Sequence, residues 1–294
     1  MKKILSGKQV SKEIIAKVKQ DVENLKKENI TPHLTIIQVG ADSASKYYAK
    51  SIIKNCQRVG IRTEFLDFSS DIEQKFLIKK IGELNDNPQV HAIQIMMPLP
   101  EHISTDCVMS AISPNKDVDC LNPLNVGKLV LGKNTFLPNT PAGVLELLKY
   151  YNIETDGKKI AILGRSNIVG KPLANLLIQK TKTGNGTITI CHSHTKNLAK
   201  ITTASDILIV AIGKPQFITE KYVSKDTIVI DVGINRILDK DTNRHKYVGD
   251  VDFDAVKSQV AAITPVPGGI GSITTAALLA NISKATQKLI SEKK

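Results

Sequence analysis

A glycine-bounded turn from Gly164 to Gly170 is the part of this sequence best suited to hold a ligand. Residues 158–163 before it predict a short buried strand, and a helix is expected to begin between Ile168 and Pro172. A strand that turns on glycine into a helix N-terminus presents free backbone N–H groups and a partial positive charge, which favour a phosphate. Because the spacing is G-x5-G and not the common G-x-G-x-x-G, an ordinary strand-to-helix turn is the alternative interpretation.

The side chains expected near this turn favour a ribose 2′-phosphate. Sites that select NAD usually carry Asp or Glu at the end of the second strand, about 20 residues after the glycine turn. Here the second strand, residues 187–191, is followed by His192, Ser193 and His194, with no carboxylate. Arg165 in the turn offers a guanidinium and Ser193 a hydroxyl group, which suit a phosphate dianion. The predicted cofactor is therefore NADP, and a solvated turn residue is the alternative interpretation of Arg165.

Strands and helices alternate along both halves of the chain. Helices are predicted over residues 4–28, 43–59, 71–85, 142–151, 169–180, 196–203 and 273–290. Strands are predicted over residues 34–39, 61–68, 90–97, 158–163, 187–191, 206–212 and 227–232. Such alternation indicates parallel sheets covered on both faces, so the predicted fold class is α/β.

The composition argues against several classes of protein. The formal net charge is +12, but the lysines are spread along the chain and aromatic residues make up only 4%, so no nucleic-acid partner is expected. A solvated lysine-rich surface explains this charge, and a positive field that attracts small polyanionic ligands is the alternative. The cysteines and histidines show no zinc-like spacing, so no metal is expected. No apolar run is long enough for a membrane span or a signal peptide, which predicts a cytoplasmic protein without a membrane partner.

Six motifs, spread over nearly the whole chain, resemble those of the methylenetetrahydrofolate dehydrogenase/cyclohydrolase family of bifunctional folate enzymes. They are Lys116-Asp-Val-Asp119, Thr140-Pro141, Gly164-Arg-Ser-Asn-Ile-Val-Gly-Lys-Pro172, Asp231-Val-Gly-Ile-Asn-Arg236, Val248-Gly-Asp250 and Ile263-Thr-Pro-Val-Pro-Gly-Gly-Ile-Gly271. Several motifs in the family's order are far more specific than any one of them.

This resemblance implies two α/β domains around a cleft, the C-terminal one Rossmann-like. Residues 1–140 with 273–294 would form the folate-binding domain, and residues 141–272 the NADP-binding domain. The implied reaction is oxidation of 5,10-methylene- to 5,10-methenyltetrahydrofolate, followed by hydrolysis to 10-formyltetrahydrofolate. The resemblance also implies a homodimer.

The site residues carried over from the family fall into two groups. Those implied for catalysis and folate binding are Tyr48, Asp119, Pro267 and Gly268. Those implied for cofactor binding are Gly164, Arg165, Ser166, Ser193 and Ile234. Core packing is the alternative role for Tyr48, and capping of a loop is the alternative for Asp119.

The sequence departs from the family pattern at three positions. Ile52 stands where the family has a lysine four residues after the tyrosine, Met96 replaces a glutamine, and Ser272 replaces a proline. A one-residue register shift that pairs Tyr47 with Lys50 is one alternative alignment. Another replacement is Gln94, which should point to the same face as position 96 but end roughly 7 Å short of it along the strand.

The departures at residues 52 and 96 predict a loss in one of the two half-reactions. Hydride transfer depends mainly on positioning, whereas hydrolysis needs an ionisable side chain to move protons. Isoleucine and methionine cannot supply one, so the sequence predicts a dehydrogenase with weak or absent cyclohydrolase activity. The alternatives are a fully bifunctional enzyme and a catalytically inactive binding protein.

Overall fold

Parallel β-sheets form the centre of both units into which the chain divides. The computed structural model describes residues 3–40, 42–239 and 244–292. Unit 1 comprises Met1–Lys12 and Thr140–Thr274, and unit 2 comprises Glu13–Asn139 and Thr275–Lys294. The predicted α/β class with parallel sheets is confirmed, whereas the predicted domain boundaries and the cleft stay predictions, and the chain ends at residues 1 and 294 lie outside the described ranges.

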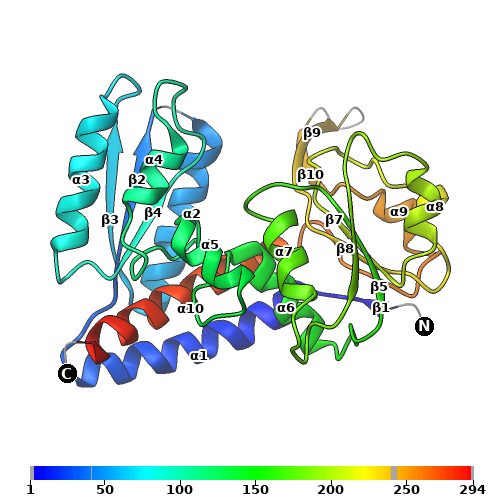
Figure 1. Ribbon diagram of the computed structural model, residues 1–294, viewed down its shortest axis with the longest axis horizontal. Helices are drawn as coiled ribbons and strands as arrows, with labels where there is room; N and C mark the ends of the chain where they lie inside the picture. Colours follow the sequence, from blue (N-terminus) through cyan, green and yellow to red (C-terminus); the bar gives the residue numbers. More distant parts are fainter. Residues whose placement is uncertain (1–2, 41, 240–243, 293–294) are drawn as a thin grey trace. The chain divides into compact units, whose positions relative to one another are not determined.

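The sheet of unit 2 has three parallel strands in the order β3-β2-β4 (Figure 1). They are β2 (His33–Val39), β3 (Arg62–Phe68) and β4 (Ala92–Ile95). The central strand β2 is buried along its whole length. Burial of every residue is typical of a parallel strand that is covered on both faces.

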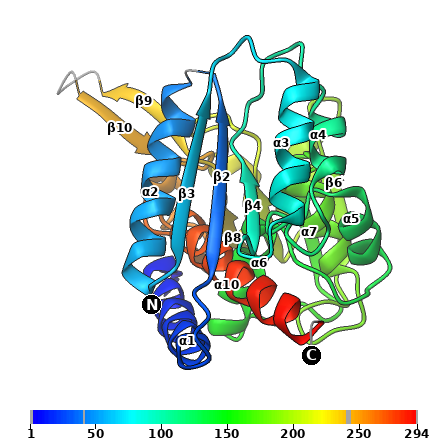
Figure 2. The same ribbon diagram turned by 90° about the vertical axis from the view of Figure 1, so that its left-hand side faces the viewer.

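Helices cover both faces of this sheet. They include α2 (Ser43–Val59), α3 (Gln74–Asp86) and α4 (Thr105–Ala111), and a further helix of unit 2 is α5 (Pro123–Val130). On one face Leu77 of α3 and Val108 of α4 pack with Ile37 and Ile95 of the sheet. Successive strand residues point to opposite faces, so the neighbouring positions face the other side, where α2 packs against β2 and β3 (Figure 2).

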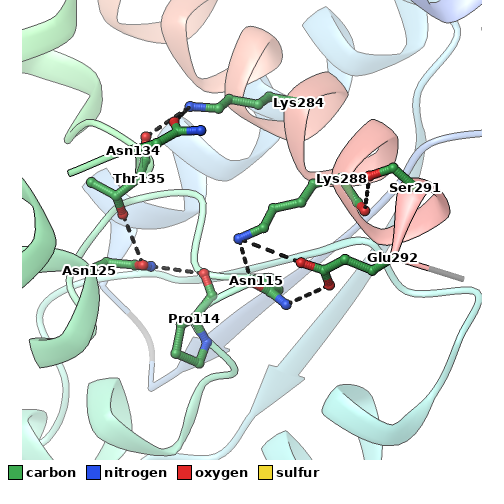
Figure 3. Close-up of polar contacts among 9 residues, drawn as sticks. All are labelled: Pro114, Asn115, Asn125, Asn134, Thr135, Lys284, Lys288, Ser291 and Glu292. Carbon is green, nitrogen blue, oxygen red and sulfur yellow. Dashed lines mark hydrogen bonds and ion pairs between the residues drawn. The ribbon is translucent and has the colours of Figure 1, made fainter.

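The last helix, α10 (Ile270–Ser291), is tied to a loop of unit 2 by lysine side chains (Figure 3). Lys288 Nζ donates to Asn115 Oδ1 at 2.7 Å, and Asn115 Nδ2 donates to Glu292 at 3.0 Å. Lys284 Nζ donates to the Thr135 carbonyl oxygen at 2.8 Å. The C-terminal part of the chain thereby holds segments on both sides of Asp119 in the sequence, since Asn115 precedes it and Thr135 follows it.

The sheet of unit 1 has six strands in the order β1-β11-β8-β7-β5-β6, all paired in parallel (Figure 1). They are β1 (Lys3–Ile4), β5 (Lys159–Leu163), β6 (Thr187–Cys191), β7 (Ile207–Val210), β8 (Ile228–Asp231) and β11 (Ala262–Ile263). The pairing of β1 with β11 places the first described residues in this sheet, although the sequence predicts a helix from residue 4. Two-residue strands carry no periodic pattern, which is why β1 and β11 are missed.

The remaining elements of the fold are helices and one antiparallel pair of strands. They are α1 (Gly7–Lys27), α6 (Asn139–Tyr150), α7 (Gly170–Leu177), α8 (Leu198–Thr203), η1 (Glu220–Tyr222), α9 (Phe253–Val256), β9 (Asn235–Asp239) and β10 (Arg244–Val248). No helix within the described ranges is both long and apolar enough to cross a bilayer.

Candidate active site

Both glycines of the opening turn are required by close backbone contacts. Gly164, at the end of β5, has a φ of 114°, and a Cβ there would lie 2.2 Å from the Ala211 carbonyl oxygen. A Cβ at Gly170, the first residue of α7, would lie 2.1 Å from the Gly164 carbonyl oxygen. Ser166 Oγ accepts a hydrogen bond from the Val169 N–H at 3.1 Å, so this side chain shapes the turn before the helix. The two glycines therefore bring the helix start close to the strand end, where the backbone N–H groups of the helix N-terminus can bind an anion.

A cavity of about 590 Å³ lies beside this turn in unit 1. It is lined by Leu163, Gly164, Arg165, Ser166, Cys191, His192, Ser193, Thr195, Leu198, Ala211, Ile212, Lys214, Phe217 and Tyr222. Four of the five predicted cofactor residues are thus brought together, and no carboxylate belongs to this lining set. Lys214 adds a cation that sequence analysis missed, because no motif position marks it. A donor set of this kind fits an anionic group such as a phosphate.

Two buried aspartates hold one wall of this cavity in place. Asp250 accepts hydrogen bonds from the backbone N–H groups of Ile212, Gly213 and Lys214 at 2.7 to 2.9 Å, and from Asn235 Nδ2 at 2.8 Å. Asp231 in turn accepts the Asp250 N–H at 3.1 Å.

Burial raises the pKa of Asp231 to about 7, and the charge of Asp250 adds to this effect. A Cβ at Gly233 would lie 2.2 Å from the carboxyl carbon of Asp250, and one at Gly249 would lie 1.8 Å from Asp231 Oδ2. The two motifs that contain these aspartates therefore shape the wall of the cavity.

Three residues carried over from the family lie outside this lining set. Ile234 is 64% exposed and follows β8. Pro267 follows a cis peptide bond, and Gly268 has a φ of 104° and accepts the Gly7 N–H at 2.9 Å. Ser272 lies in the first turn of α10, where its N–H donates to Gly269 at 3.1 Å. The ligand contacts of the first three therefore stay predictions.

In unit 2, Lys116 and Asp117 form a polar frame next to Asp119. Lys116 is 4% exposed and its Nζ donates to three carbonyl oxygens between residues 84 and 87, at 2.7 to 2.8 Å. The Asp117 carboxylate accepts the N–H groups of Leu121 and Asn122 at 3.0 and 2.9 Å. Lys116 and Asp117 thus have a structural role. Within the same motif, Asp119 is therefore the candidate for ligand binding.

Asp119 has a raised pKa because its carboxyl group is largely desolvated. Burial raises the pKa to about 7, and the charge of Asp117 acts in the same direction. Hydrogen bonds from Asn139 and Gln94 act in the opposite direction. Both donors are side-chain amides, and Asp119 as a residue keeps part of its surface accessible. A carboxylate of this kind can still accept hydrogen bonds from a ligand.

Tyr48 lies close enough to Asp119 to sense its charge. Burial raises the pKa of Tyr48 to about 12, the charge of Asp119 adds to the rise, and a hydrogen bond with Thr275 opposes it. Tyr48 as a whole is 37% exposed, although burial desolvates its hydroxyl group. Tyr47 is 71% exposed, which gives the shifted register no support. Tyr48 is therefore a hydrogen-bonding group that stays protonated at neutral pH.

The two positions predicted to depart from the family pattern are buried apolar residues. Ile52 is 0% exposed and Met96 is 3% exposed. The side chain of Gln94 interacts with the Asp119 carboxyl group, and its predicted distance from position 96 stays a prediction.

Sequence analysis missed three side chains that surround the two acidic centres of these units. They are Asn139, Thr275 and Asn235. Asn139 directly precedes the Thr140-Pro141 motif and Asn235 lies within the motif that begins at Asp231, so both could have been found from these motifs. Nothing in the sequence marks Thr275. Among the described residues, no group of three or more His, Cys, Asp or Glu side chains is placed to hold a metal ion.

Comparison with known proteins gives matches to both parts of the chain. Residues 5–119 match the family model "Tetrahydrofolate dehydrogenase/cyclohydrolase, catalytic domain", and residues 138–290 match the NAD(P)-binding domain of the same family. The "Bifunctional protein FolD" of Chloroherpeton thalassium is 48% identical over 291 residues, which are 98% of this chain and 99% of the relative.

Solved structures agree with these matches. The bifunctional FolD dehydrogenase/cyclohydrolase of Campylobacter jejuni has a TM-score of 0.91 and 41% identity, over 97% of this chain and 98% of that one. The Trypanosoma brucei FolD enzyme, complexed with NADP cofactor and inhibitor, has a TM-score of 0.91 and 33% identity, over 99% of both chains. The resemblance inferred from the motifs is therefore confirmed, and this chain belongs to the tetrahydrofolate dehydrogenase/cyclohydrolase family.

Proposed function

We propose that this chain oxidises 5,10-methylenetetrahydrofolate to 5,10-methenyltetrahydrofolate with NADP, and that its cyclohydrolase step is weak or absent. The single observation that carries the choice of cofactor is the cavity in unit 1, which has Arg165, Lys214 and Ser193 in its lining and no carboxylate. When bound, NADP supplies the acceptor for the hydride that leaves the folate. The protein's own residues hold the phosphate groups and orient the folate.

Arg165 is the residue we assign to the 2′-phosphate. A guanidinium can form two parallel hydrogen bonds with a phosphate, and Ser193 can donate a third from its hydroxyl group. A carboxylate at this place would instead accept hydrogen bonds from a free 2′-hydroxyl and repel the phosphate. The Trypanosoma brucei relative, which was solved with NADP, supports the same choice.

The Arg165→Ala variant tests this assignment. We expect the KM for NADP to rise about 10- to 100-fold, because a hydrogen bond to a charged group contributes about 1.5 to 3 kcal/mol. The KM for NAD should change little. Arg244→Ala, which removes an exposed arginine from the same unit, is the matched control. Equal losses with NAD and NADP would contradict the assignment.

Asp119 and Tyr48 are the residues we assign to the folate. An ionised Asp119 can accept hydrogen bonds from the N–H groups of the pterin ring, and a protonated Tyr48 can donate one. Neither Ile52 nor Met96 can exchange a proton, so nothing at these positions activates water for hydrolysis. We therefore expect oxidation to exceed hydrolysis.

A fully bifunctional enzyme is the second candidate function, and the names of the curated relatives support it better than they support a loss of hydrolysis. The relative from Chloroherpeton thalassium is named a bifunctional protein, and Asp119, with a pKa of about 7, can change protonation state at neutral pH. This carboxyl group could accept a proton from water in place of the lysine that the family pattern has at position 52. Hydrolysis of methenyltetrahydrofolate can be measured as the loss of its absorbance. A rate above the uncatalysed rate would favour this candidate.

The double variant Ile52→Lys with Met96→Gln separates the two candidates further. If the apolar pair limits hydrolysis, this variant should raise hydrolysis more than oxidation. The matched control is Ile53→Lys with Met97→Gln, which changes the neighbouring, more exposed positions. Equal changes in both activities would contradict the proposed loss.

A further inference from the structure

Two glutamine side chains are buried on one face of the small sheet in unit 2. Gln94 of β4 is 5% exposed and Gln38 of β2 is 0% exposed. Gln94 pairs in register with Ile36, whereas Ile37 pairs with Ile95 and both belong to the core under α3 and α4. Gln94 and Gln38 therefore point to the opposite face of the sheet.

Each of these glutamines leaves its carbonyl oxygen unused. Among the residues that the structure describes, neither Gln94 Oε1 nor Gln38 Oε1 has a hydrogen-bond partner, although both atoms are buried. A buried polar atom without a partner costs about 1 to 3 kcal/mol, so its presence in a native protein calls for a reason. Binding of a ligand that carries N–H or O–H groups is such a reason.

The amide groups of the two glutamines have different partners. Gln38 Nε2 donates to the backbone oxygens of Val39 and Gly40 at 3.3 and 3.5 Å. The carboxamide of Gln94 instead hydrogen-bonds the Asp119 carboxylate, as does the side chain of Asn139. Only Gln94 thus joins an unused acceptor to the candidate folate carboxylate.

We infer that Gln94 is a positioning residue for Asp119 and that its Oε1 accepts a hydrogen bond from the same ligand. The Gln94 amide N–H group donates to the Asp119 carboxylate, and Gln94 Oε1 is a further acceptor beside the carboxylate oxygens. Such a row fits a heterocycle with adjacent ring N–H and amino groups, as in the 2-amino-4-oxopyrimidine half of a pterin. The inference rests on the proposed folate site. It assigns to Gln94 the polar role that the family pattern gives to a glutamine at position 96.

The charges around Asp119 determine what the loss of Gln94 would do. Asp117, Tyr48 and Cys120 are titratable groups of the described part of the chain that interact with this carboxyl group. Burial and Asp117 raise its pKa, while Gln94 and Asn139 lower it. Without Gln94 the carboxyl group should stay protonated to higher pH and then accept fewer hydrogen bonds from the ligand.

Gln94→Met is the test, since methionine fills a similar volume without an amide group. We expect the pH at which kcat/KM for methylenetetrahydrofolate reaches half its maximum to rise by about one unit, because a charged hydrogen bond is lost. Well above that pH a several-fold loss should persist, because the Oε1 acceptor is also gone. The KM for NADP should not change.

Gln38→Met is the matched control. It removes an equally buried glutamine from the same face, but one that is bonded to the backbone, so the pH profile should keep its wild-type midpoint. Unfolding curves of both variants show whether either substitution merely disturbs the fold.

A carbon-13 NMR titration of the Asp119 carboxyl group, assigned with Asp119→Asn, keeps the test independent of activity. The pKa of Asp119 should be higher in Gln94→Met than in the wild type and unchanged in Gln38→Met. An unchanged Asp119 titration in Gln94→Met would overturn the inference, even if the wild type is an active dehydrogenase. Absence of NADP reduction by the wild type would instead contradict the proposed function.

Discussion

Asp119 and Asp250 are both desolvated carboxylates next to candidate sites, but they are held by different groups. Asp250 is 0% exposed and is bonded by three backbone N–H groups and one side-chain amide. Asp119 keeps part of its surface accessible and is bonded by the side-chain amides of Asn139 and Gln94. A fully buried carboxylate that is bonded mainly by backbone donors fixes a loop, whereas one that keeps accessible surface can still bind a ligand.

The largest expected effect comes from the same substitution at the two aspartates. Asp119→Asn should lower kcat/KM for methylenetetrahydrofolate about 100-fold, because two charged hydrogen bonds to the ligand are weakened. Its free energy of unfolding should change by less than about 1 kcal/mol, since burial already penalises the charged form. Asp250→Asn should instead lower the free energy of unfolding by about 3 kcal/mol. Steady-state kinetics measure kcat/KM and urea unfolding measures the free energy of unfolding of the two variants. Similar losses of stability in both would contradict the different roles of Asp119 and Asp250.

Gly249→Ala tests the same contrast through the backbone. The added Cβ would lie 1.8 Å from Asp231 Oδ2, so the carboxylate that holds Asp250 must move. We expect a loss of roughly 2 to 3 kcal/mol in the free energy of unfolding.

Gly82→Ala is the control for that loss, because Gly82 lies inside α3 and an added Cβ meets nothing within 4 Å. It should increase stability by about 0.5 to 1 kcal/mol. Equal losses in the two glycine variants would show that the clash with Asp231 is not the cause.

The pH dependence of folate use should come from Asp119. Its pKa is raised to about 7, and the ionised form binds the ligand, so kcat/KM should fall as the pH drops through about 7. Below that value we expect about a tenfold loss per pH unit. Asp119→Asn should abolish this dependence, whereas a dependence that survives in Asp119→Asn would assign it to another group, such as Asp231.

The smallest expected effects are those of the two asparagines that serve these carboxylates. Asn235→Ala removes one of four donors to Asp250 and should cost about 1 kcal/mol of stability with no change in the pH profile for folate. Asn139→Ala removes a donor to Asp119 and should shift that profile to higher pH. Thermal unfolding and kinetics on both variants check these two effects. A shift of the pH profile of kcat/KM in Asn235→Ala would contradict the separate roles of Asp119 and Asp250.

The long elements of the fold could be predicted because their apolar residues recur with a regular period. Residues 43–59 are a helix in both the prediction and the structure. The two-residue strands β1 and β11 are too short for any period, and most residues of β10 are exposed, so hydrophobic patterning cannot find it. Long periodic segments are thus predictable, while short or exposed strands depend on their pairing partners.

The candidate site shows the same limit at the level of side chains. The turn with Gly164 and Arg165 was predictable because backbone chemistry requires glycine there and a cation suits a phosphate. The contact between Gln94 and Asp119 was not, because it joins residues far apart in the sequence and depends on the direction of their side chains. Asp231 and Asp250 lie in motifs that mark them as important, but only the structure shows that they hold the wall at residues 212–214.

The pairing of β1 with β11 has a consequence for fragments of the chain that are expressed separately. A fragment that starts at Thr140 would lack Lys3 and Ile4, and it would leave the backbone groups of Ala262 and Ile263 open along one side. Unpaired strand edges recruit other strands, so such a fragment should self-associate. Recombination that transfers the NAD(P)-binding part of this enzyme as one continuous segment would therefore leave out its edge strand, β1, and would not transfer a complete sheet.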